Sequence, residues 1–285
     1  MEVILAENAG FCFGVKRAIN LAFKAAKHNK KAVYTLGPII HNQQVVKKLE
    51  EAGVKVIEGF NGERLLPEIK RLKSATIIIR THGVSPKIMD ILKSNKLEII
   101  DATCPIVGKS QKIVKSLYDE GYKVVIVGEK EHPEIKSIKG FANDEVLVVN
   151  STEEAERIPK LSKIGLVAQT TLSFIHFQEV VLCMLDKATE FKIYNTICTA
   201  TAKAQNKALK LSREVDIMIV VGGKNSANTR HLAEICSKEI ETNHIEDVTE
   251  LRKEWFNGKK KVGITAGAST PDWVINEVVH KINKF

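Results

Sequence analysis

Three cysteines stand at nearly equal intervals along the chain, and this spacing limits what the chain can fold into. Cys12, Cys104 and Cys198 are 92 and 94 residues apart. A regular spacing on this scale indicates a structural unit that is repeated three times. Each cysteine also follows a short β-rich run and precedes an apolar, lysine-containing pattern with helical periodicity. The chain is therefore predicted to contain three versions of one supersecondary unit.

The repeat continues beyond the cysteines. Each helical pattern leads to an apolar strand that ends in glycine, 24 or 25 residues after its cysteine, at Gly37, Gly128 and Gly222. Polar residues follow these glycines: four positions later stand His41, His132 and Ser226, and six positions later Gln43, Glu134 and Asn228. A later strand in each unit also ends in polar residues, namely His82, Thr170 with Thr171, and Ser269. Three strands of each unit thus carry chemistry-bearing residues at their ends.

Strands that alternate with helices predict parallel sheets covered by helices. The repeat predicts an α/β fold with three lobes, over residues 7–102, 103–196 and 197–285. The third unit ends without a closing strand, whereas an additional strand over residues 3–6 precedes the first cysteine. We therefore predict that residues 1–6 join the sheet of the third lobe. The lobes are expected to form a pseudo-threefold, trefoil-like arrangement.

Composition and charge exclude several classes of protein. The 285 residues are 44% hydrophobic and 27% charged, which is typical of globular proteins. No apolar run of about 18 residues predicts a membrane span, and the N-terminus lacks the pattern of a signal peptide, so a cytoplasmic protein with reduced cysteines is expected. The net charge of +9 favours anionic partners. The lysines form no stripe interleaved with aromatic residues, so nucleic acid is not an expected partner.

The repeated polar residues predict a single binding cavity, because ligands of α/β sheets bind beyond the carboxyl ends of the strands. Cys12, Cys104 and Cys198 could be buried small residues, zinc ligands or ligands of an iron–sulfur cluster. Structural zinc favours four ligands at short spacings, which this chain lacks, and a catalytic zinc with three cysteines is uncommon. A cubane cluster fits better. Three thiolates would leave one iron without a protein ligand, and that iron could bind a substrate oxygen.

The other two cysteines and the polar residues have separate interpretations. Cys183 and Cys236 lie in apolar helical stretches and are predicted to be ordinary core or surface thiols. The remaining repeat residues offer hydrogen-bond donors, several of them at helix N-termini, and this suits a phosphate. These residues are His41, His82, His132, Thr171, Ser226, Asn228 and Ser269. The cavity is therefore predicted to be an anion site beside a metal cluster.

Nine segments between residues 6 and 272 together resemble one enzyme family. They are AENAGFCFGVKRAI, YTLGPIIHN, IIRTHGV, IIDATCP, GEKEHPE, AQTTLS, TICTAT, GGKNSANT and ITAGASTPD. Their order and spacing are similar to those of the 4-hydroxy-3-methylbut-2-enyl diphosphate reductases, the last enzymes of the non-mevalonate isoprenoid pathway. One departure is Ala227, which stands where that family often has a second serine.

The resemblance implies a 4Fe-4S cluster that is held by Cys12, Cys104 and Cys198 and has one iron without a protein ligand. It also implies a diphosphate site made by His41, His82, His132, Ser226, Asn228 and Ser269. Glu134 and either Thr170 or Thr171 would lie near the allylic alcohol, with Glu134 as the proton source and His132 as a further candidate. The implied reaction is a reductive dehydroxylation that yields isopentenyl and dimethylallyl diphosphates.

Two further expectations accompany this resemblance. The electrons would come from an external donor such as ferredoxin or flavodoxin, whose acidic surface would suit a basic protein. The alternative is a non-redox hydro-lyase that uses a three-thiolate cluster as a Lewis acid. A carboxylate substrate of such an enzyme would need a cluster of arginines, and the chain has none near the motifs. Arg80 is the only arginine beside them apart from two within predicted helices, which opposes this alternative.

Overall fold

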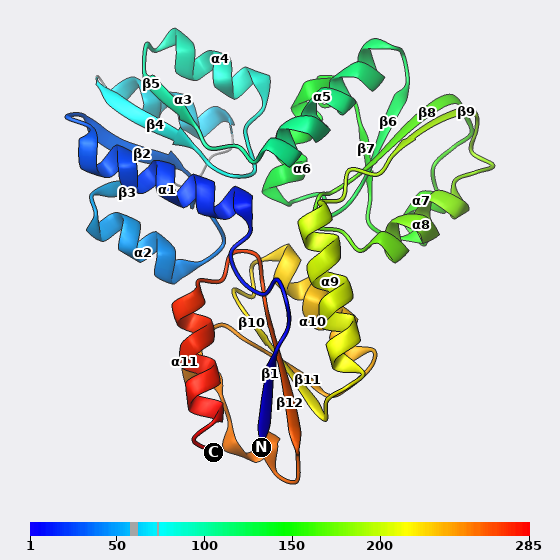
Figure 1. Ribbon diagram of the computed structural model, residues 1–285. Helices are drawn as coiled ribbons and strands as arrows, with labels where there is room; N and C mark the ends of the chain where they lie inside the picture. The colour runs from blue at the N-terminus through cyan, green and yellow to red at the C-terminus, as the bar shows by residue number, and fades with distance from the viewer. Residues whose placement is uncertain (58–61, 73) are drawn as a thin grey trace. The chain divides into compact units, whose positions relative to one another are not determined.

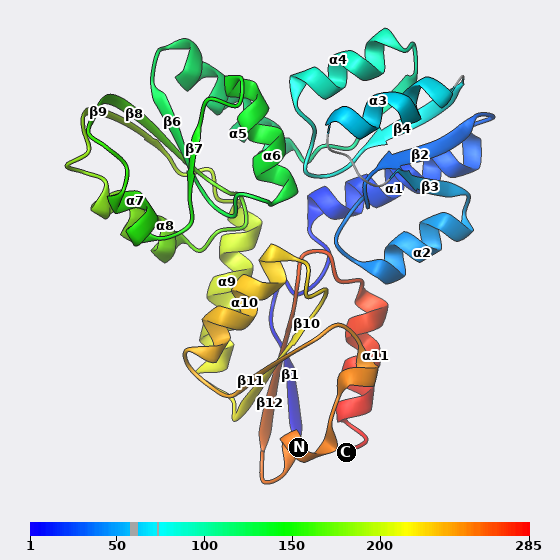
Figure 2. The ribbon, with the colours of Figure 1, turned by 180° about the vertical axis from the view of Figure 1, so that it is seen from behind.

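The computed structural model describes residues 1–57, 62–72 and 74–285 of the chain (Figure 1). Its strands form three separate four-stranded sheets, and every strand pair in them is parallel. Helices cover the sheets (Figures 1 and 2). The prediction of three parallel α/β lobes is confirmed. Within the described ranges, no helix is long and apolar enough to cross a membrane.

The three sheets are distributed over two compact units. Unit 1 consists of Met1–Lys16, Ile40–Val45 and Cys198–Phe285, and unit 2 consists of Arg17–Ile39 and Val46–Ile197. Unit 1 contains the third sheet, and unit 2 contains the first and second sheets. The predicted lobe boundaries and the trefoil arrangement remain predictions. Each unit is described below by itself.

The first sheet has the strand order β3-β2-β4-β5. Its strands are β2 (Ala32–Leu36), β3 (Val54–Ile57), β4 (Ala75–Ile79) and β5 (Glu98–Asp101). The accompanying helices are α1 (Phe13–His28), α2 (Gln43–Glu51), α3 (Gly62–Arg71) and α4 (Pro86–Ser94). All five residues of β4 are buried. A central strand that is apolar throughout is typical of a parallel sheet with both faces covered.

The second sheet repeats this order as β7-β6-β8-β9. Its strands are β6 (Lys123–Val127), β7 (Leu147–Val149), β8 (Leu161–Ala168) and β9 (Ala188–Tyr194). The helices of this lobe are α5 (Pro105–Asp119), α6 (Pro133–Lys139), α7 (Thr152–Glu156) and α8 (Phe174–Cys183), with a short 3-10 turn, η1 (Gly140–Ala142). Proline occupies the first position of both α5 and α6, where its missing N–H costs no helical hydrogen bond.

The third sheet has the order β1-β12-β10-β11. Its strands are β1 (Glu2–Leu5), β10 (Ile217–Val221), β11 (Thr242–Ile245) and β12 (Lys261–Ala266). The helical elements are α9 (Thr199–Ser212), α10 (Ala227–Ser237), α11 (Asp272–Ile282), η2 (Val248–Glu250) and η3 (Lys253–Phe256). β1 pairs in parallel with β12, in the edge position where the repeat lacks a closing strand. It begins at Glu2 and not at residue 3, because an exposed edge tolerates a charged side chain.

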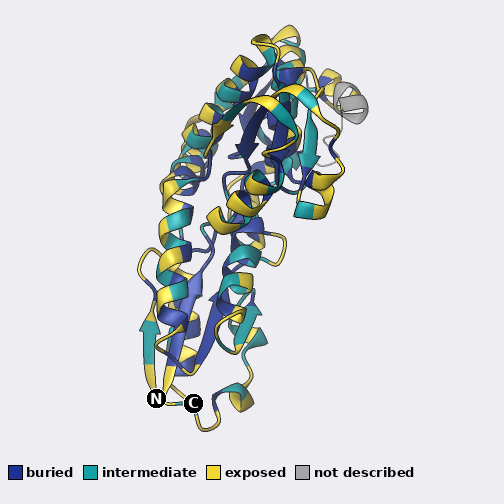
Figure 3. Ribbon diagram, turned by 90° about the vertical axis from the view of Figure 1, so that its right-hand side faces the viewer, coloured by how far each residue is buried: buried dark blue, intermediate teal, exposed yellow. Residues whose placement is uncertain are grey.

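The core of the third lobe shows how sequence alternation places the helices. Ile217, Ile219 and Val221 of β10 pack with α11, whereas Met218 and Val220 pack with α9 and α10 on the opposite face. Successive side chains of a strand point to opposite faces, so an entirely apolar strand serves both layers. Figure 3 shows the central strands as buried and the outer helix faces as exposed. This packing fixes the carboxyl ends of the strands, where the predicted site residues lie.

Candidate active site

The three repeated cysteines occupy the same local position in their lobes. Cys104 and Cys198 are the N-cap residues of α5 and α9, and Cys12 directly precedes the first residue of α1. The backbone anchors them: the Cys12 N–H donates to the Ala268 carbonyl at 3.2 Å, and the Cys104 N–H donates to the Thr81 carbonyl at 2.9 Å. Helix N-termini carry partial positive charge, which stabilises thiolates.

Cys12 and Cys198 both belong to unit 1, and the charge of Cys198 acts on the Cys12 thiol. Burial raises the pKa of the Cys12 thiol, and the charge of Cys198 raises it further. Hydrogen bonds from the backbone N–H groups of Gly14 and Val15 oppose this shift. Two thiols that repel each other when ionised, one of which faces N–H donors, suit a shared cation or cluster that would compensate both charges.

The other two cysteines behave as predicted from their apolar surroundings. Cys236 is fully buried in the core of the third lobe, where burial raises the pKa of its thiol to about 12. Cys183 ends α8, and its thiol donates to the Thr152 carbonyl at 3.5 Å. All five cysteines lie in the described residues, and none of them forms a disulfide. Neither Cys183 nor Cys236 stands at a strand–helix junction.

Glu134 and Thr170 form a buried pair in unit 2. Glu134 is 1% exposed, and its carboxylate accepts two hydrogen bonds from Thr170: from the backbone N–H at 2.8 Å and from the hydroxyl at 2.7 Å. Burial raises the pKa of Glu134 to about 7, although the hydrogen bonds from Thr170 lower it in part. The carboxyl group therefore changes its protonation near neutral pH, as a proton donor must.

The threonine beside this pair has a different partner. Thr171 accepts a hydrogen bond from the Gln169 side-chain amide at 3.0 Å. The amide oxygen of Gln169 in turn accepts from the Glu129 backbone N–H at 2.9 Å, which fixes the orientation of the amide. The sequence left Thr170 and Thr171 equivalent, whereas the structure pairs Thr170 with the acid. Gln169 was not among the predicted site residues.

His132 starts the helix that carries Glu134. It is the N-cap of α6, and its Nδ1 accepts from the Glu134 backbone N–H at 3.2 Å. In the neutral ring, an acceptor at Nδ1 places the proton on Nε2, so Nε2 is a donor. The ring of His82 lies against that of His132 in an edge-to-face arrangement, with centroids 5.2 Å apart. Two predicted histidines from different lobes of unit 2 thus come together.

A glycine permits this approach of the His82 loop to the second lobe. Gly83 has a φ of +70°, and a Cβ at this position would lie 2.5 Å from the Gln111 side-chain nitrogen and 3.1 Å from the Ser137 hydroxyl. Only glycine fits both the backbone conformation and the space. Gln111 and Ser137 are themselves joined by a 2.9 Å hydrogen bond. The glycine of the IIRTHGV segment therefore helps to position His82.

The predicted anion-binding residues of unit 1 gather at the carboxyl ends of its strands. Ser226 is the N-cap of α10, and its hydroxyl accepts from the Thr229 backbone N–H. Asn228 is 6% exposed, and its side-chain oxygen is buried without a hydrogen-bond partner among the residues that the structure describes. A buried polar atom of this kind is costly unless a ligand or water satisfies it.

His41 joins this group through its backbone. The hydroxyl of Ser269 donates to the His41 carbonyl oxygen at 3.3 Å. Gly223 permits the same segment to approach α10, because a Cβ there would lie 2.9 Å from the His41 carbonyl oxygen. The segment Ile40–Val45 therefore packs with the third lobe and belongs to unit 1. His41, Ser226, Asn228 and Ser269 all lie in one compact unit.

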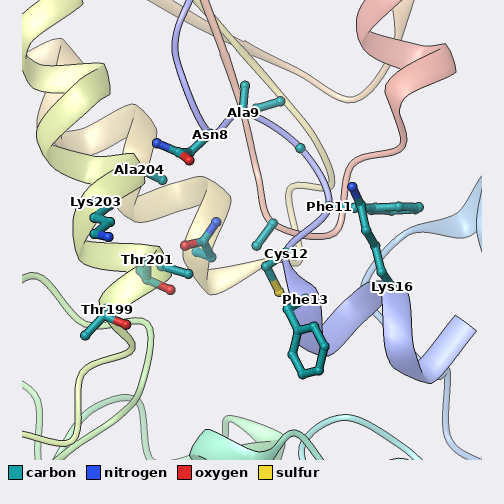
Figure 4. A pocket seen from close by; sticks show the side chains of 15 residues that line it. Asn8, Ala9, Phe11, Cys12, Phe13, Lys16, Thr199, Thr201, Lys203 and Ala204 are labelled. Carbon is teal, nitrogen blue, oxygen red and sulfur yellow. The ribbon is translucent and has the colours of Figure 1, made fainter.

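A cavity of about 480 Å³ lies beside Cys12 in unit 1 (Figure 4). It is lined by Asn8, Ala9, Gly10, Phe11, Cys12, Phe13, Lys16, Thr199, Ala200, Thr201, Lys203, Ala204, Asn228, Ala266 and Ala268. We call it the Cys12 pocket. Cys12 and Asn228 both line it, and we call the part formed by the first turn of α1 and the first two turns of α9 its rim. The pocket thus brings a predicted metal ligand and a predicted anion ligand together.

A further buried cation lies near the predicted anion ligands of unit 2. Arg80 is 8% exposed and stands two residues before His82. Burial lowers the pKa of its guanidinium to about 10, so it remains charged at neutral pH. The sequence showed Arg80 beside a motif but did not show its burial.

The fold and these groups define a three-lobed α/β protein with cysteines at its strand–helix junctions and a buried acid two residues after the histidine that caps its helix. The LytB protein family model matches residues 3–283. The chain therefore belongs to the LytB protein family.

Named relatives cover the whole chain. The 4-hydroxy-3-methylbut-2-enyl diphosphate reductases of Geobacter metallireducens and Pelobacter propionicus are 51% and 52% identical to it over 100% of this chain, which corresponds to 98% and 99% of theirs. A solved structure described as (E)-4-hydroxy-3-methyl-but-2-enyl diphosphate reductase, the terminal enzyme of the non-mevalonate pathway, is similar with 44% identity, a TM-score of 0.69 and full coverage of both chains. The reductase from Plasmodium falciparum is similar with 28% identity and a TM-score of 0.89, over 98% of this chain and 87% of that one.

Proposed function

We propose that the chain reduces 4-hydroxy-3-methylbut-2-enyl diphosphate to isopentenyl and dimethylallyl diphosphates. The buried pair of Glu134 and Thr170 is the observation that carries this proposal. An acid with a pKa of about 7 that has its own hydroxyl partner is suited to proton transfer near neutral pH. The naming of relatives that match the whole chain at about half identity supports the same activity.

The reaction replaces a C–O bond by a C–H bond. One molecule of 4-hydroxy-3-methylbut-2-enyl diphosphate, two electrons and two protons give one molecule of isopentenyl or dimethylallyl diphosphate and one water. One proton leaves with the hydroxyl group as water, and the other forms the new C–H bond. Two electrons balance the equation, so an electron donor is required. This requirement separates the reaction from a dehydration, which consumes no electrons.

Cys12, Cys104 and Cys198 are the proposed ligands of a 4Fe-4S cluster in which one iron lacks a protein ligand. The local chemistry fits such a group: all three thiols stand at helix starts, and the Cys12 thiol faces two backbone N–H donors. When bound, the cluster supplies single electrons and a Lewis-acidic iron.

The proposed diphosphate ligands are polar side chains that follow strand ends. In unit 1, the Asn228 side chain is buried and its oxygen has no partner among the described residues, and the Asn228 amide nitrogen is a donor for a phosphate oxygen. In unit 2, the Nε2 of His132 is a donor because its Nδ1 already accepts a hydrogen bond. His41, His82, Ser226 and Ser269 complete the proposed set. Anchoring the diphosphate holds the carbon chain in one orientation.

Proton delivery is assigned to Glu134 acting with Thr170. The Thr170 hydroxyl oxygen lies 2.7 Å from the Glu134 carboxylate. When Glu134 is protonated, its O–H can donate to this oxygen, and the Thr170 hydroxyl can pass its own proton to a neighbouring oxygen. The further candidates for this proton transfer are His132 and Thr171. The hydroxyl of Thr171 accepts a hydrogen bond from the Gln169 amide. The raised pKa keeps a large fraction of Glu134 protonated at pH 7.

The proposed electron donor is an external protein such as ferredoxin or flavodoxin. Such donors are acidic, and this chain carries a net charge of +9. Five cysteines without a disulfide suit the reducing cytoplasm, which is the proposed location.

The test is an electron count under anaerobic conditions. Purified protein reconstituted with iron and sulfide is assayed with reduced methyl viologen, and viologen oxidation is compared with the isopentenyl and dimethylallyl diphosphates formed. The proposal predicts two electrons per product molecule. Loss of water from the substrate without viologen oxidation would identify a hydro-lyase and contradict the proposal.

A further inference from the structure

The rim of the Cys12 pocket has features that the proposed chemistry does not use. Phe13 is 73% exposed, more than any other large hydrophobic side chain in the described residues. It directly follows Cys12 and starts α1. Neighbouring Cα atoms are 3.8 Å apart, so a partner that covers Phe13 binds at the residue next to Cys12. This exposed aromatic side chain lines the Cys12 pocket and directly follows a predicted metal ligand.

Two lysines flank this aromatic residue on the same rim. Lys16 lies one turn further along α1, and Lys203 lies on the second turn of α9 (Figure 4). Both are exposed, and neither forms an ion pair with a described residue. The starts of α1 and α9 add the positive ends of two helix dipoles. The rim therefore presents unneutralised positive charge around an apolar centre.

The nearby acid does not cancel this charge. Glu7 already pairs with Lys207 of α9 at 2.7 Å, and Lys207 is the main cause that lowers the pKa of Glu7. Lys210, on the next turn of α9, also contributes positive charge near Glu7. This side of α9 thus carries more positive than negative groups along two turns beyond the pocket.

We propose that Phe13, Lys16 and Lys203 form the docking surface for an acidic electron-transfer protein. This inference rests on the proposed function, because it names the place where the required electrons enter. Charge complementarity would orient the donor during encounter, and Phe13 would provide the apolar contact at the centre of the interface. The position fits electron entry, since the surface lies next to the thiol of a proposed cluster ligand.

The decisive variant reverses the charge of both rim lysines, Lys16→Glu with Lys203→Glu. The matched control is Lys284→Glu, an exposed lysine that follows α11, near the C-terminus at the end of unit 1 away from the strand carboxyl ends (Figure 1). Each protein is assayed with reduced ferredoxin and, separately, with reduced methyl viologen. Binding of ferredoxin is also measured directly by calorimetry at several salt concentrations, with protein that is not turning over.

The double variant is expected to lose at least about tenfold in kcat/KM for ferredoxin and in ferredoxin affinity at low salt, with a weaker salt dependence of binding. Ferredoxin-supported turnover should fall more than viologen-supported turnover, so that the ratio of the two rates drops by at least about tenfold. Lys284→Glu should match the parent in both assays. Phe13→Ala should weaken ferredoxin binding at high salt as well, because its contact is apolar.

Three outcomes would overturn the docking proposal. The first is unchanged ferredoxin affinity in the double variant, and the second is an equal loss of ferredoxin affinity in Lys284→Glu. The third is a double variant that loses only self-association or RNA binding. If the double variant also lost viologen turnover, Lys16→Gln with Lys203→Gln would remove the charge without reversing it, and ferredoxin affinity would decide. A parent enzyme that is inactive with viologen would contradict the proposed function, whatever the binding result.

Discussion

The starts of α6 and α10 occupy the same place in two lobes, yet they carry different chemistry. His132 caps α6 through its ring nitrogen, and Ser226 caps α10 through its hydroxyl. Two residues after each cap stands a buried polar side chain, Glu134 in one lobe and Asn228 in the other. The fold thus supplies one framework, and the residue at this position decides what each lobe contributes.

The partners of these two side chains explain the division. The carboxylate of Glu134 is held by two hydrogen bonds from Thr170, whereas the side-chain oxygen of Asn228 is unsatisfied within the described structure. An acid that already has its partners can exchange a proton without moving. The Asn228 oxygen still needs a donor, and the Asn228 amide nitrogen is itself a donor that can bind a phosphate oxygen. We interpret the second lobe as the proton-donating side and the third lobe as an anchoring side.

The largest effect is expected from variants that lose a ligand of the proposed iron–sulfur cluster. Cys104→Ser, like Cys12→Ser or Cys198→Ser, should lose the cluster or nearly all activity, because a hydroxyl is a poor ligand for iron–sulfur clusters. Iron content and anaerobic turnover are the measurements. Cys183→Ser and Cys236→Ser are the matched controls and should retain both iron and activity. Normal iron content and turnover in Cys104→Ser would show that the ligand assignment is wrong.

Glu134→Gln tests the proton-donating side. Glutamine keeps the shape and can accept a hydrogen bond from Thr170, but it cannot deliver an acidic proton. Turnover should fall by roughly 10²–10⁴, the usual contribution of general acid catalysis, while iron content and diphosphate affinity stay near normal. In the parent enzyme, turnover should decline as the pH rises above about 7 because Glu134 loses its proton. A variant with near-parental turnover would remove Glu134 from the mechanism.

Asn228→Ala tests the anchoring side and should have the opposite kinetic signature. Losing one charge-assisted hydrogen bond costs roughly 1.5–3 kcal/mol, which corresponds to about a ten- to hundredfold loss in diphosphate affinity. Calorimetric titration with isopentenyl diphosphate measures this loss. The free alcohol without its diphosphate serves as the control ligand and should be affected little. Equal weakening of both ligands would argue against a phosphate-binding role for Asn228.

The smallest effect concerns stability and follows from the raised pKa of Glu134. The folded protein holds this proton more tightly than the unfolded chain, so its contribution to stability is complete below about pH 4.5 and is lost as the pH rises to about 7. Glu134→Gln avoids burying a charge at higher pH. The variant should therefore gain stability relative to the parent between these pH values, reaching roughly 1–3 kcal/mol at pH 8.

Urea denaturation of the two proteins at pH 5 and pH 8 provides this measurement. The stability difference should be larger at pH 8 than at pH 5. A difference that does not change with pH would mean that Glu134 has an ordinary pKa in the folded protein, and the reason for assigning it as a proton source near neutral pH would disappear.

Much of this organisation could be predicted from the sequence because the repeat fixes equivalent positions. Strand–helix alternation was sufficient for three parallel sheets, and the missing closing strand of the third unit indicated where β1 would pair. The repeat also singled out Glu134, since its equivalents are Gln43 and Asn228. Sequence position could not distinguish Thr170 from Thr171, because only the conformation after β8 decides which of them faces the acid.

Other features depend on contacts that sequence spacing does not report. Gln169 is fully buried and holds Thr171, but a glutamine at a strand end carries no distinctive pattern. The two compact units were not predicted either. The segment Ile40–Val45 packs with the third lobe because Ser269 bonds to the His41 carbonyl and Gly223 leaves room for it. Such long-range contacts become visible only in three dimensions.

The most direct test of the account is the Mössbauer spectrum of anaerobically purified, iron-57-enriched protein. The account predicts a four-iron cluster in which one iron site differs from the other three, because Cys12, Cys104 and Cys198 provide only three thiolates. Addition of 4-hydroxy-3-methylbut-2-enyl diphosphate should change the signal of that single site and leave the other three nearly unchanged. A two-iron cluster, a mononuclear metal site or four equivalent irons that ignore the substrate would contradict the account.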